Sequence, residues 1–381
     1  MNASSCWNGE SMIIDRVDII HIQIPLNIPY ETSYQKNICL DKIILKVFTK
    51  DAIVFSECVC KDIPLSTYET PGTVRTVLKN FILPAIMGKN IEEPEDFWKY
   101  AGHFKGHNMA KAGLENAIWA LVSLKKGISI AKMLGGRKST IPVGHGVGIQ
   151  NSTEKLLDII EEYIEFGFNR IKLKISHGWD TAVLEKVRSK YPDLPLMVDA
   201  NTDYKWPEDQ EILKALDHFD LTMIEQPLVW EDLFYHAKLQ ESIKTPICLD
   251  ESIFSPYTAR MAAIMKSCKI INIKQGRCGG LTPSLKIHDI AQKNGIKCWV
   301  GQMIETGVAL TYGLAVASLD NCVYHNDLIP TKYYLSDDIV VPEMVLNPDS
   351  TVDVPDKPGM GISIDEKKLE HYSISREIIK I

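Results

Sequence analysis

Long apolar runs, surplus positive charge and two common catalytic motifs are missing from this sequence. No run approaches the roughly 20 apolar residues of a membrane-spanning helix, so no membrane span is predicted. Lysine and arginine total 42 against 49 aspartates and glutamates, which gives a net charge of −7. That sign argues against nucleic acid or an anionic membrane as a partner. Neither a Gly-x-Ser-x-Gly nor a Walker motif occurs, so the sequence gives no sign of a serine hydrolase or a P-loop enzyme.

The N-terminus lacks the marks of a secretory signal. Residues 1–12 have neither a basic start nor an apolar core, and we expect them to be disordered in a cytoplasmic protein. The nine cysteines are odd in number and include no Cys-x-x-Cys pair. Cys248, Cys268, Cys278 and Cys298 lie in or beside predicted strands. Buried, reduced thiols are therefore expected, not disulfides or a metal cluster.

A regular series of short apolar runs extends from residue 170 to residue 274, and each run ends in a charged residue. The intervals between the charged ends are 24 to 26 residues. Such an interval fits one strand of about 5 residues, one helix of about 11 and two loops. The charged ends are Lys174, Asp199, Glu225, Asp250 and Lys274.

Repeated strand–helix units predict parallel strands that close into a barrel. The predicted fold is α/β: a modified (β/α)8 barrel of the TIM type with an α+β capping domain. Ser152 is the predicted N-cap of the first barrel helix, and Thr282, before Pro283, that of a later one. The predicted elements are strands 139–149 and 295–300, helices 153–166, 180–190, 207–219, 232–243, 256–266, 282–294 and 306–319, and a ring-closing segment at 322–325.

The chain outside the barrel predicts a second unit. Apolar alternation indicates strands at 13–25, 43–49 and 53–60, followed by helices, of which the last ends near Gly127. The polar stretch 29–36 suits a mobile loop. We therefore divide the chain into a capping domain (1–135), a barrel (136–328) and a tail (329–381) that packs on the capping domain.

Three carboxylates, Asp199, Glu225 and Asp250, end successive strands of the predicted barrel. The carboxyl ends of barrel strands form the active-site rim, so we expect the three around one point. Together they would repel one another, and a hard cation such as Mg²⁺ or Mn²⁺ suits an all-oxygen site. Asn201 and Glu251 follow two of these carboxylates and are expected to orient them.

Lysines flank the carboxylates. Lys172 and Lys174 are two residues apart and so face the same side of a strand. Inward lysines in a normally apolar barrel are costly unless their charge is used. Lys274 ends the strand three places beyond that of Asp199, so we expect it across the mouth. A substrate carboxylate between Lys174 and Lys274 could lose its α-proton to either lysine, and the cation would stabilise the enediolate.

At these residues the chain resembles the enolase superfamily, in its muconate-lactonizing-enzyme subgroup. The matching segments are Lys172-Leu-Lys174, Asp199-Ala-Asn201, Glu225-Gln-Pro227, Leu249-Asp-Glu251 and Asn272-Ile-Lys274. Over roughly residues 13–365 the chain is most similar to the o-succinylbenzoate synthase / N-succinylamino acid racemase family. The segments that carry this closer resemblance include 106–111, 134–136, 245–252, 277–281 and 303–307.

The resemblance implies roles for these residues. Asp199, Glu225 and Asp250 would bind the metal, Lys174 and Lys274 would form the acid/base pair, and Lys172 would tune Lys174. The 29–36 loop would be a lid, and the protein would be a homo-oligomer. The implied substrate pocket contains Ser33, Met303, Ile304 and Glu305. This last segment also departs from the family, because it reads Gly301-Gln-Met-Ile where relatives usually read Gly-Gly-Met-Leu.

The expected reaction is therefore dehydration to o-succinylbenzoate, racemisation of N-succinylamino acids, or both. The alternative is a racemase, epimerase or cycloisomerase of the same subgroup with a different small carboxylate substrate. A barrel glycosidase needs two carboxylates but has no use for inward lysines on both sides. A binding protein without catalysis would have lost a lysine or a carboxylate from the set, and none is lost.

Overall fold

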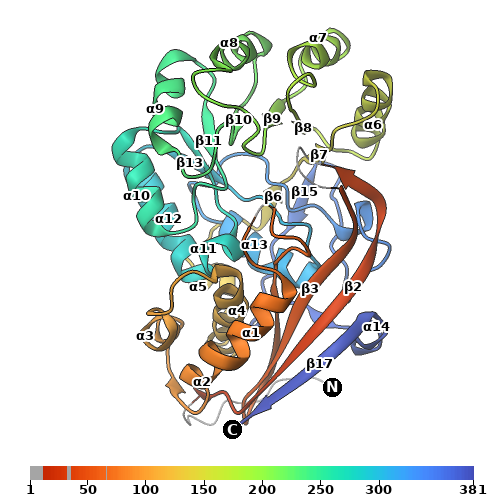
Figure 1. The fold of residues 1–381 in the computed structure, drawn as a ribbon. Helices are drawn as coiled ribbons and strands as arrows, with labels where there is room; N and C mark the ends of the chain where they lie inside the picture. Colours follow the sequence, from red (N-terminus) through yellow and green to blue (C-terminus); the bar gives the residue numbers. More distant parts are fainter. Residues whose placement is uncertain (1–11, 32–35, 66) are drawn as a thin grey trace.

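The computed structural model describes residues 12–31, 36–65 and 67–381. Figure 1 shows two parts, a parallel sheet surrounded by helices in the upper part and a sheet of long strands flanked by helices in the lower part. None of the described helices has the length and apolar character to cross a bilayer. The cysteines Cys248, Cys268, Cys278 and Cys298 are buried and free, as predicted.

The parallel sheet carries the charged strand ends. Its strands follow the order β13-β12-β11-β10-β9-β8-β7. All residues of β8 and β9 are buried, because helices cover one face of the sheet and side chains fill the other. The strands are β7 His145–Val147, β8 Ile171–Lys174, β9 Leu196–Asp199, β10 Ile224–Glu225, β11 Ile247–Leu249, β12 Ile270–Asn272 and β13 Lys297–Trp299.

The ring closes through a segment that is not a regular strand, and the described chain has the seven predicted strands of the modified (β/α)8 barrel, which is thereby confirmed. Single parallel bridges join Cys298 of β13 to Cys322, and Val143 to Asn326. Asn326 also accepts a hydrogen bond from Val300 N through its side-chain oxygen, at 2.8 Å. The predicted place of closure, 322–325, is therefore right, but isolated bridges replace a strand ladder.

The predicted first strand, 139–149, is divided in two. Its first half is β6 (Thr140–Pro142), which pairs antiparallel with β15 (Thr351–Asp353) and not with the barrel. The second half is β7, which pairs with β8. Pro142 separates the halves, because proline has no N–H to continue a ladder.

The barrel helices lie close to their predicted positions, and Ser152 caps the first by accepting a hydrogen bond from Lys155 N at 3.2 Å. The predicted start of α12 at Thr282 is wrong. Glu115, from another helix, accepts hydrogen bonds from Leu281 N (2.7 Å) and Thr282 N (3.0 Å), so the helix begins at Leu281. The helices are α6 Thr153–Glu165, α7 Thr181–Lys190, α8 Gln210–Ala215 with the 3-10 turn η2 Leu216–Phe219, α9 Leu233–Ser242, α10 Pro256–Met265, α11 Gln275–Cys278, α12 Leu281–Lys293 and α13 Gly307–Ala317.

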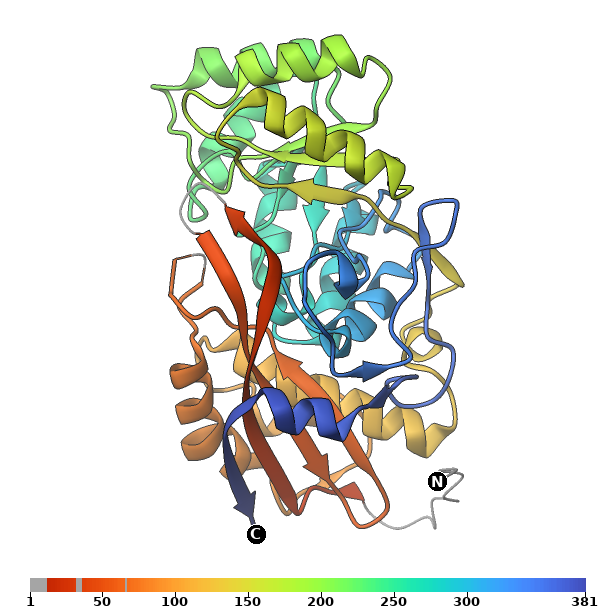
Figure 2. The same ribbon diagram turned by 90° about the vertical axis from the view of Figure 1, so that its right-hand side faces the viewer.

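The antiparallel sheet has the order β17-β2-β3-β4. Its strands are β2 Arg16–Glu31, β3 Lys36–Phe48, β4 Ile53–Cys58 and β17 Ser373–Lys380. Ile20, Ile22 and Ile24 of β2 are fully buried and alternate with more exposed polar residues, which is the pattern of a strand with one face in the core. Figure 2 shows β17 lying along β2 at the edge of this sheet, with α14 (Glu366–Tyr372) across it.

Helices cover the inner face of this sheet. The longest, α4, packs on β3 and β4 and ends at Gly127, as predicted, with φ at +69°. The other elements before the barrel are β1 Met12–Ile13, α1 Pro71–Val77, the π-helix η1 Leu78–Ile82, α2 Leu83–Ile86, β5 Asn90–Ile91, α3 Asp96–Ala101 and α5 Ile130–Met133.

Two predictions for the N-terminal part need correction. Met12, expected to be disordered, is buried and pairs with Ile91. The predicted loop 29–36 is shorter than expected, because β2 continues to Glu31 and β3 begins at Lys36. Ser33 lies outside the described residues.

The C-terminal segment contacts both parts of the molecule. β17 pairs with β2, whereas β15 pairs with β6 beside the barrel. The remaining elements are the 3-10 turn η3 Thr331–Tyr333, β14 Val340–Val341 and β16 Ser363–Ile364, and the last two pair with each other. The domain boundaries at 135 and 328 stay a prediction.

Candidate active site

Strand register brings the charged strand ends together. Lys174 of β8 lies beside Asp199 of β9, and Asp199 lies beside Glu225 of β10. Asp250 and Lys274 follow directly on β11 and β12, the next two strands of the sheet. All three carboxylates are at most 1% exposed, so their charges must be compensated within the protein.

Asp199 lies between two ammonium groups. Its Oδ2 is 2.6 Å from Lys174 Nζ and 3.4 Å from Lys172 Nζ. Burial raises the pKa of Asp199, but these two lysines outweigh burial and leave the pKa well below its usual range. Lys174 also donates a 2.5 Å hydrogen bond to Asn201 Oδ1. The inward lysines expected from the spacing therefore do face the carboxylates.

Glu225 is the least compensated of the three carboxylates. Lys172 Nζ is 3.1 Å from its Oε2, and the Asn272 amide donates to its Oε1 at 2.6 Å. Burial, followed by the neighbouring charge of Asp199, raises the pKa of Glu225. A cation among the three carboxylates would remove this penalty.

Asp250 has two cationic partners. Lys274 Nζ is 2.8 Å from its Oδ2, and Arg277 Nη1 donates to its Oδ1. Burial raises the pKa of Asp250, and Arg277 and Lys274 together lower it to below its ordinary value. The Gln226 side chain accepts a hydrogen bond from Asp250 N at 2.9 Å and so fixes the backbone at this strand end.

The donor chemistry of this cluster fits a hard divalent cation, although the side chains are turned toward their cationic neighbours. The described residues include no group of three histidine, cysteine, aspartate or glutamate side chains that already converges as metal ligands. Three buried carboxylates on consecutive strands nevertheless offer only oxygen, which Mg²⁺ and Mn²⁺ prefer. The raised pKa of Glu225 indicates that the lysines do not fully compensate the negative charge of the three carboxylates.

Asn201 and Glu251 contact each other, as expected for residues that orient the cluster. Asn201 Nδ2 donates to Glu251 Oε1 at 3.1 Å, and Asn201 N donates to Asp199 Oδ1 at 3.0 Å. Glu251 Oε2 is buried and has no hydrogen-bond partner in the described chain. Burial and the charge of Asp250 raise the pKa of Glu251.

The predicted pocket residues separate into different environments. Met303 Sδ lies 3.7 Å from Arg277 Nη2, beside the cluster. Ile304 lines a small pocket that opens toward β3. Glu305 is buried, accepts a 3.4 Å hydrogen bond from Met303 N, and interacts with the charge of Glu57 of β4.

Sequence reasoning gave no role to four residues that hold the cluster: Gln226, Asn272, Arg277 and Asp327. Asp327 contacts Lys172 Nζ at 2.5 Å and Arg170 Nη2 at 2.8 Å. Gln226, Asn272 and Arg277 lie in or beside the segments that carried the family resemblance, and that position was the available signal. Asp327 follows the ring-closing segment, and no local pattern indicates that it reaches β8.

Comparisons with known proteins identify the protein family to which this barrel belongs. A family model described as "Enolase C-terminal domain-like" matches residues 155–368, more than half of the chain. An o-succinylbenzoate synthase from Geobacillus stearothermophilus is 40% identical over 361 residues, which cover 94% of this chain and 96% of that protein. An N-succinylamino acid racemase from Thermus thermophilus is 35% identical, with coverages of 95% and 98%.

A solved structure agrees with these relatives. An enolase-superfamily member from Listeria innocua superimposes with a TM-score of 0.93 at 35% identity, covering 97% of this chain and 99% of that one. The chain belongs to the enolase superfamily and, within it, to the family of o-succinylbenzoate synthases and N-succinylamino acid racemases. The resemblance seen in the sequence is thereby confirmed, and the chain is an enzyme of this family. Enolase-superfamily sites use a lysine or histidine base together with one or two Mg²⁺ ions.

Proposed function

We propose that this enzyme removes the proton α to a substrate carboxylate, with Lys174 and Lys274 as the two acid/base groups, and that its main product is o-succinylbenzoate. The observation that carries the proposal is the placement of the two ammonium groups. Lys174 is the last residue of β8 and Lys274 follows β12, with three strands between them, and each contacts a different carboxylate of the cluster. A substrate bound between them would present one face to each lysine.

In the dehydration, one lysine takes the α-proton, and the electron pair of the broken C–H bond forms the new double bond. The β-hydroxyl leaves, and the same lysine, now protonated, gives it the proton, so that water is released. In a racemisation, the opposite lysine instead returns a proton to the other face. The 40% identity to a named o-succinylbenzoate synthase supports dehydration as the main reaction, and a base on each face supports racemisation as the second.

Asp199, Glu225 and Asp250 would hold Mg²⁺ or Mn²⁺, and Asn201 and Glu251 would keep these ligands in place. The bound cation would supply positive charge that neutralises the substrate carboxylate and stabilises the negative charge that develops on it. Lys172, at 3.1 to 3.4 Å from Glu225 and Asp199, would hold the two carboxylates together while Lys174 moves its proton.

Hydrogen exchange tests the acid/base pair. Each enantiomer of an N-succinylamino acid is incubated with enzyme and Mg²⁺ in deuterated water, and loss of the α-proton signal is followed by NMR. Lys174→Ala and Lys274→Ala should each abolish exchange from one enantiomer, a loss of about 100-fold or more. Lys293→Met, at the exposed end of α12, removes the same charge and should exchange both enantiomers normally. Exchange of both enantiomers at the wild-type rate by both alanine variants would contradict the mechanism.

The same enzyme preparations test the reaction and the metal. Formation of o-succinylbenzoate from its β-hydroxy acid precursor should be measurable with wild-type enzyme, should stop in chelator, and should return with Mg²⁺ or Mn²⁺. Full turnover in chelator would refute the cation site. Exchange without dehydration would leave the racemase as the main activity.

A further inference from the structure

Helix α4 joins the antiparallel-sheet part of the molecule to the barrel, where it packs on α11 and α12 (Figure 1). Two asparagines of α4 donate hydrogen bonds to α11. Asn116 Nδ2 donates to Gln275 Oε1 at 2.7 Å. Asn108 Nδ2 donates to Arg277 O at 2.9 Å. These contacts fall on the short helix that directly follows Lys274.

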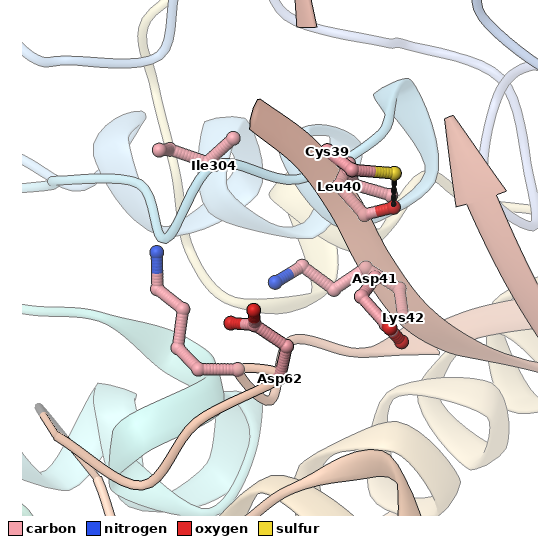
Figure 3. Close-up of a pocket in the computed structure, with 7 residues that line it drawn as sticks. Cys39, Leu40, Asp41, Lys42, Asp62 and Ile304 are labelled. Carbon is pink, nitrogen blue, oxygen red and sulfur yellow. Dashed lines mark hydrogen bonds between the residues drawn. The ribbon is translucent and has the colours of Figure 1, made fainter. Parts of the chain in front are cut away.

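The contact between α11 and the antiparallel-sheet part leaves no gap. A Cβ at Gly276 of α11 would overlap the side chain of Val59, which follows β4. By contrast, Figure 3 shows Ile304 and Asp62 on opposite walls of a small pocket, where the loop after β13 approaches β3. Helix α11 has only four residues, too few to be stable alone, so its position depends on the surface against which it packs.

The backbone of Lys274 depends on α11. Lys274 is the N-cap residue of this helix, and its carbonyl accepts a hydrogen bond from Cys278 N at 3.0 Å. Strand β12 ends two residues earlier, so Lys274 lies outside the sheet ladder. Lys174 differs, because it is the last residue of β8 and is paired with Asp199 of β9. The barrel sheet therefore positions one lysine, and a helix that packs on α4 positions the other.

The amide pair between α4 and α11 is buried in spite of an unpaired group. Asn116 is fully buried and Gln275 is 4% exposed. Asn116 Oδ1 has no hydrogen-bond partner within the described chain. A buried amide with an unpaired oxygen is less stable there than an apolar side chain of the same size. Stability therefore does not account for the pair, whereas its placement does, because it attaches the first residue of α11 to α4.

We propose that Asn116, acting through Gln275, is a positioning residue for Lys274 and not for Lys174. The inference rests on the proposed function, in which each lysine serves one face of the substrate. A shift of α11 by about 1 Å moves the Lys274 ammonium group relative to the α-carbon and leaves Lys174 in place, and a misplacement of this size can slow a reaction about 100-fold. Loss of the amide pair therefore impairs proton transfer at one face only.

Hydrogen exchange measured separately for each enantiomer tests the inference. Each enantiomer of an N-succinylamino acid is incubated with enzyme and Mg²⁺ in deuterated water, and Lys274→Ala identifies the enantiomer that depends on Lys274. Asn116→Leu should slow exchange of that enantiomer by about 10- to 100-fold and change exchange of the other by less than about twofold. Gln275→Leu removes the same contact from the barrel side and should have the same effect.

Two controls separate positioning from stability. Ser123→Ala removes a hydroxyl of α4 that donates one hydrogen bond and accepts another, about two turns from Asn116, and should leave both exchange rates unchanged. The double variant Asn116→Leu/Gln275→Leu leaves neither amide unpaired. It should therefore have a higher thermal midpoint than either single variant, while exchange of the Lys274-dependent enantiomer stays slow.

Equal slowing of both enantiomers in Asn116→Leu and in the double variant would overturn the inference, because it would show a general loss of structure. Exchange of both enantiomers at the wild-type rate in these variants would overturn it as well. Both results leave the proposed function intact as long as each lysine substitution abolishes exchange from one enantiomer. If Lys174→Ala and Lys274→Ala both exchange both enantiomers at the wild-type rate, the proposed function is refuted and the inference with it.

Discussion

Replacing Asp327 with asparagine should destabilise the protein, because this carboxylate compensates two buried cations. Its Oδ1 is 2.8 Å from Arg170 Nη2 and its Oδ2 is 2.5 Å from Lys172 Nζ. The three side chains are 11%, 3% and 5% exposed, so water cannot take over the role of the carboxylate. Asparagine keeps the size of the side chain and removes only the charge.

The expected magnitude follows from the pKa of Asp327. Burial raises the pKa of Asp327, but Lys172 and Arg170 lower it by more, and the net change is from 3.8 to about 2. A depressed pKa of this size corresponds to about 2 kcal/mol of stability at neutral pH. Removing one partner of a fully buried ion pair costs about 3 to 5 kcal/mol. We therefore expect Asp327→Asn to lower the free energy of unfolding by about 2 to 5 kcal/mol.

Urea denaturation followed by tryptophan fluorescence measures this change, and Trp299 lies near both cations. Asp320→Asn is the control, since Asp320 forms an exposed ion pair with Arg137 and its loss should cost less than about 1 kcal/mol. The stabilising charge is present above the unfolded pKa and is lost as the pH falls through the folded pKa. The difference between wild type and Asp327→Asn should therefore shrink from pH 4 to pH 2. Equal, small effects of both substitutions would refute the reasoning.

Two further predictions concern a glycine at the start of α12 and a buried carboxylate of β4. Gly280 has a φ of +120° at the start of α12, and a Cβ there would overlap the Glu115 carboxylate. Gly280→Ala should therefore lower the thermal midpoint more than Gly127→Ala, because Gly127 has open space around it and its substitution costs only about 1 kcal/mol of backbone strain. Equal shifts of the two midpoints would contradict this prediction. Burial and Glu305 raise the pKa of Glu57 to about 8. The folded state therefore loses stability as the pH rises from about 4.5 toward 8. Glu57→Gln, which cannot ionise, should gain stability relative to wild type between pH 5 and pH 8 in urea titrations, and a constant difference would count against the assignment.

The strand ends could be predicted from the sequence because parallel βα units of constant length must bring their carboxyl ends to one rim. Lys174, Asp199, Glu225 and Lys274 follow from that rule alone. The side chains that stabilise this cluster could not be predicted in the same way. Asp327 contacts Lys172 only because the chain closes the barrel at that point. Arg277 lies after β12 and contacts Asp250, which follows the neighbouring strand β11.

Local sequence patterns also gave wrong element boundaries where a residue distant in the sequence supplies the hydrogen bonds. Thr282-Pro283 is a good sequence for a helix start, but Glu115 of α4 satisfies the N–H groups of Leu281 and Thr282 and moves the start upstream. Thr282 instead accepts a hydrogen bond from Trp119 at 3.0 Å. Similarly, the apolar run 139–149 reads as one strand, and only the pairing of β6 with β15 shows that it divides.

The pairing of β17 with β2 has a consequence for the order in which the protein folds. During synthesis β2 emerges among the first strands and β17 emerges last, after the whole barrel. Until then β2 has one open edge, with unpaired N–H and C=O groups that can pair with another chain. The pairing of β17 with β2 closes the largest loop of the chain, so it must form after the barrel strands have been made and cannot direct the folding of the barrel. The barrel should therefore be able to form on the ribosome while the antiparallel sheet is still one strand short.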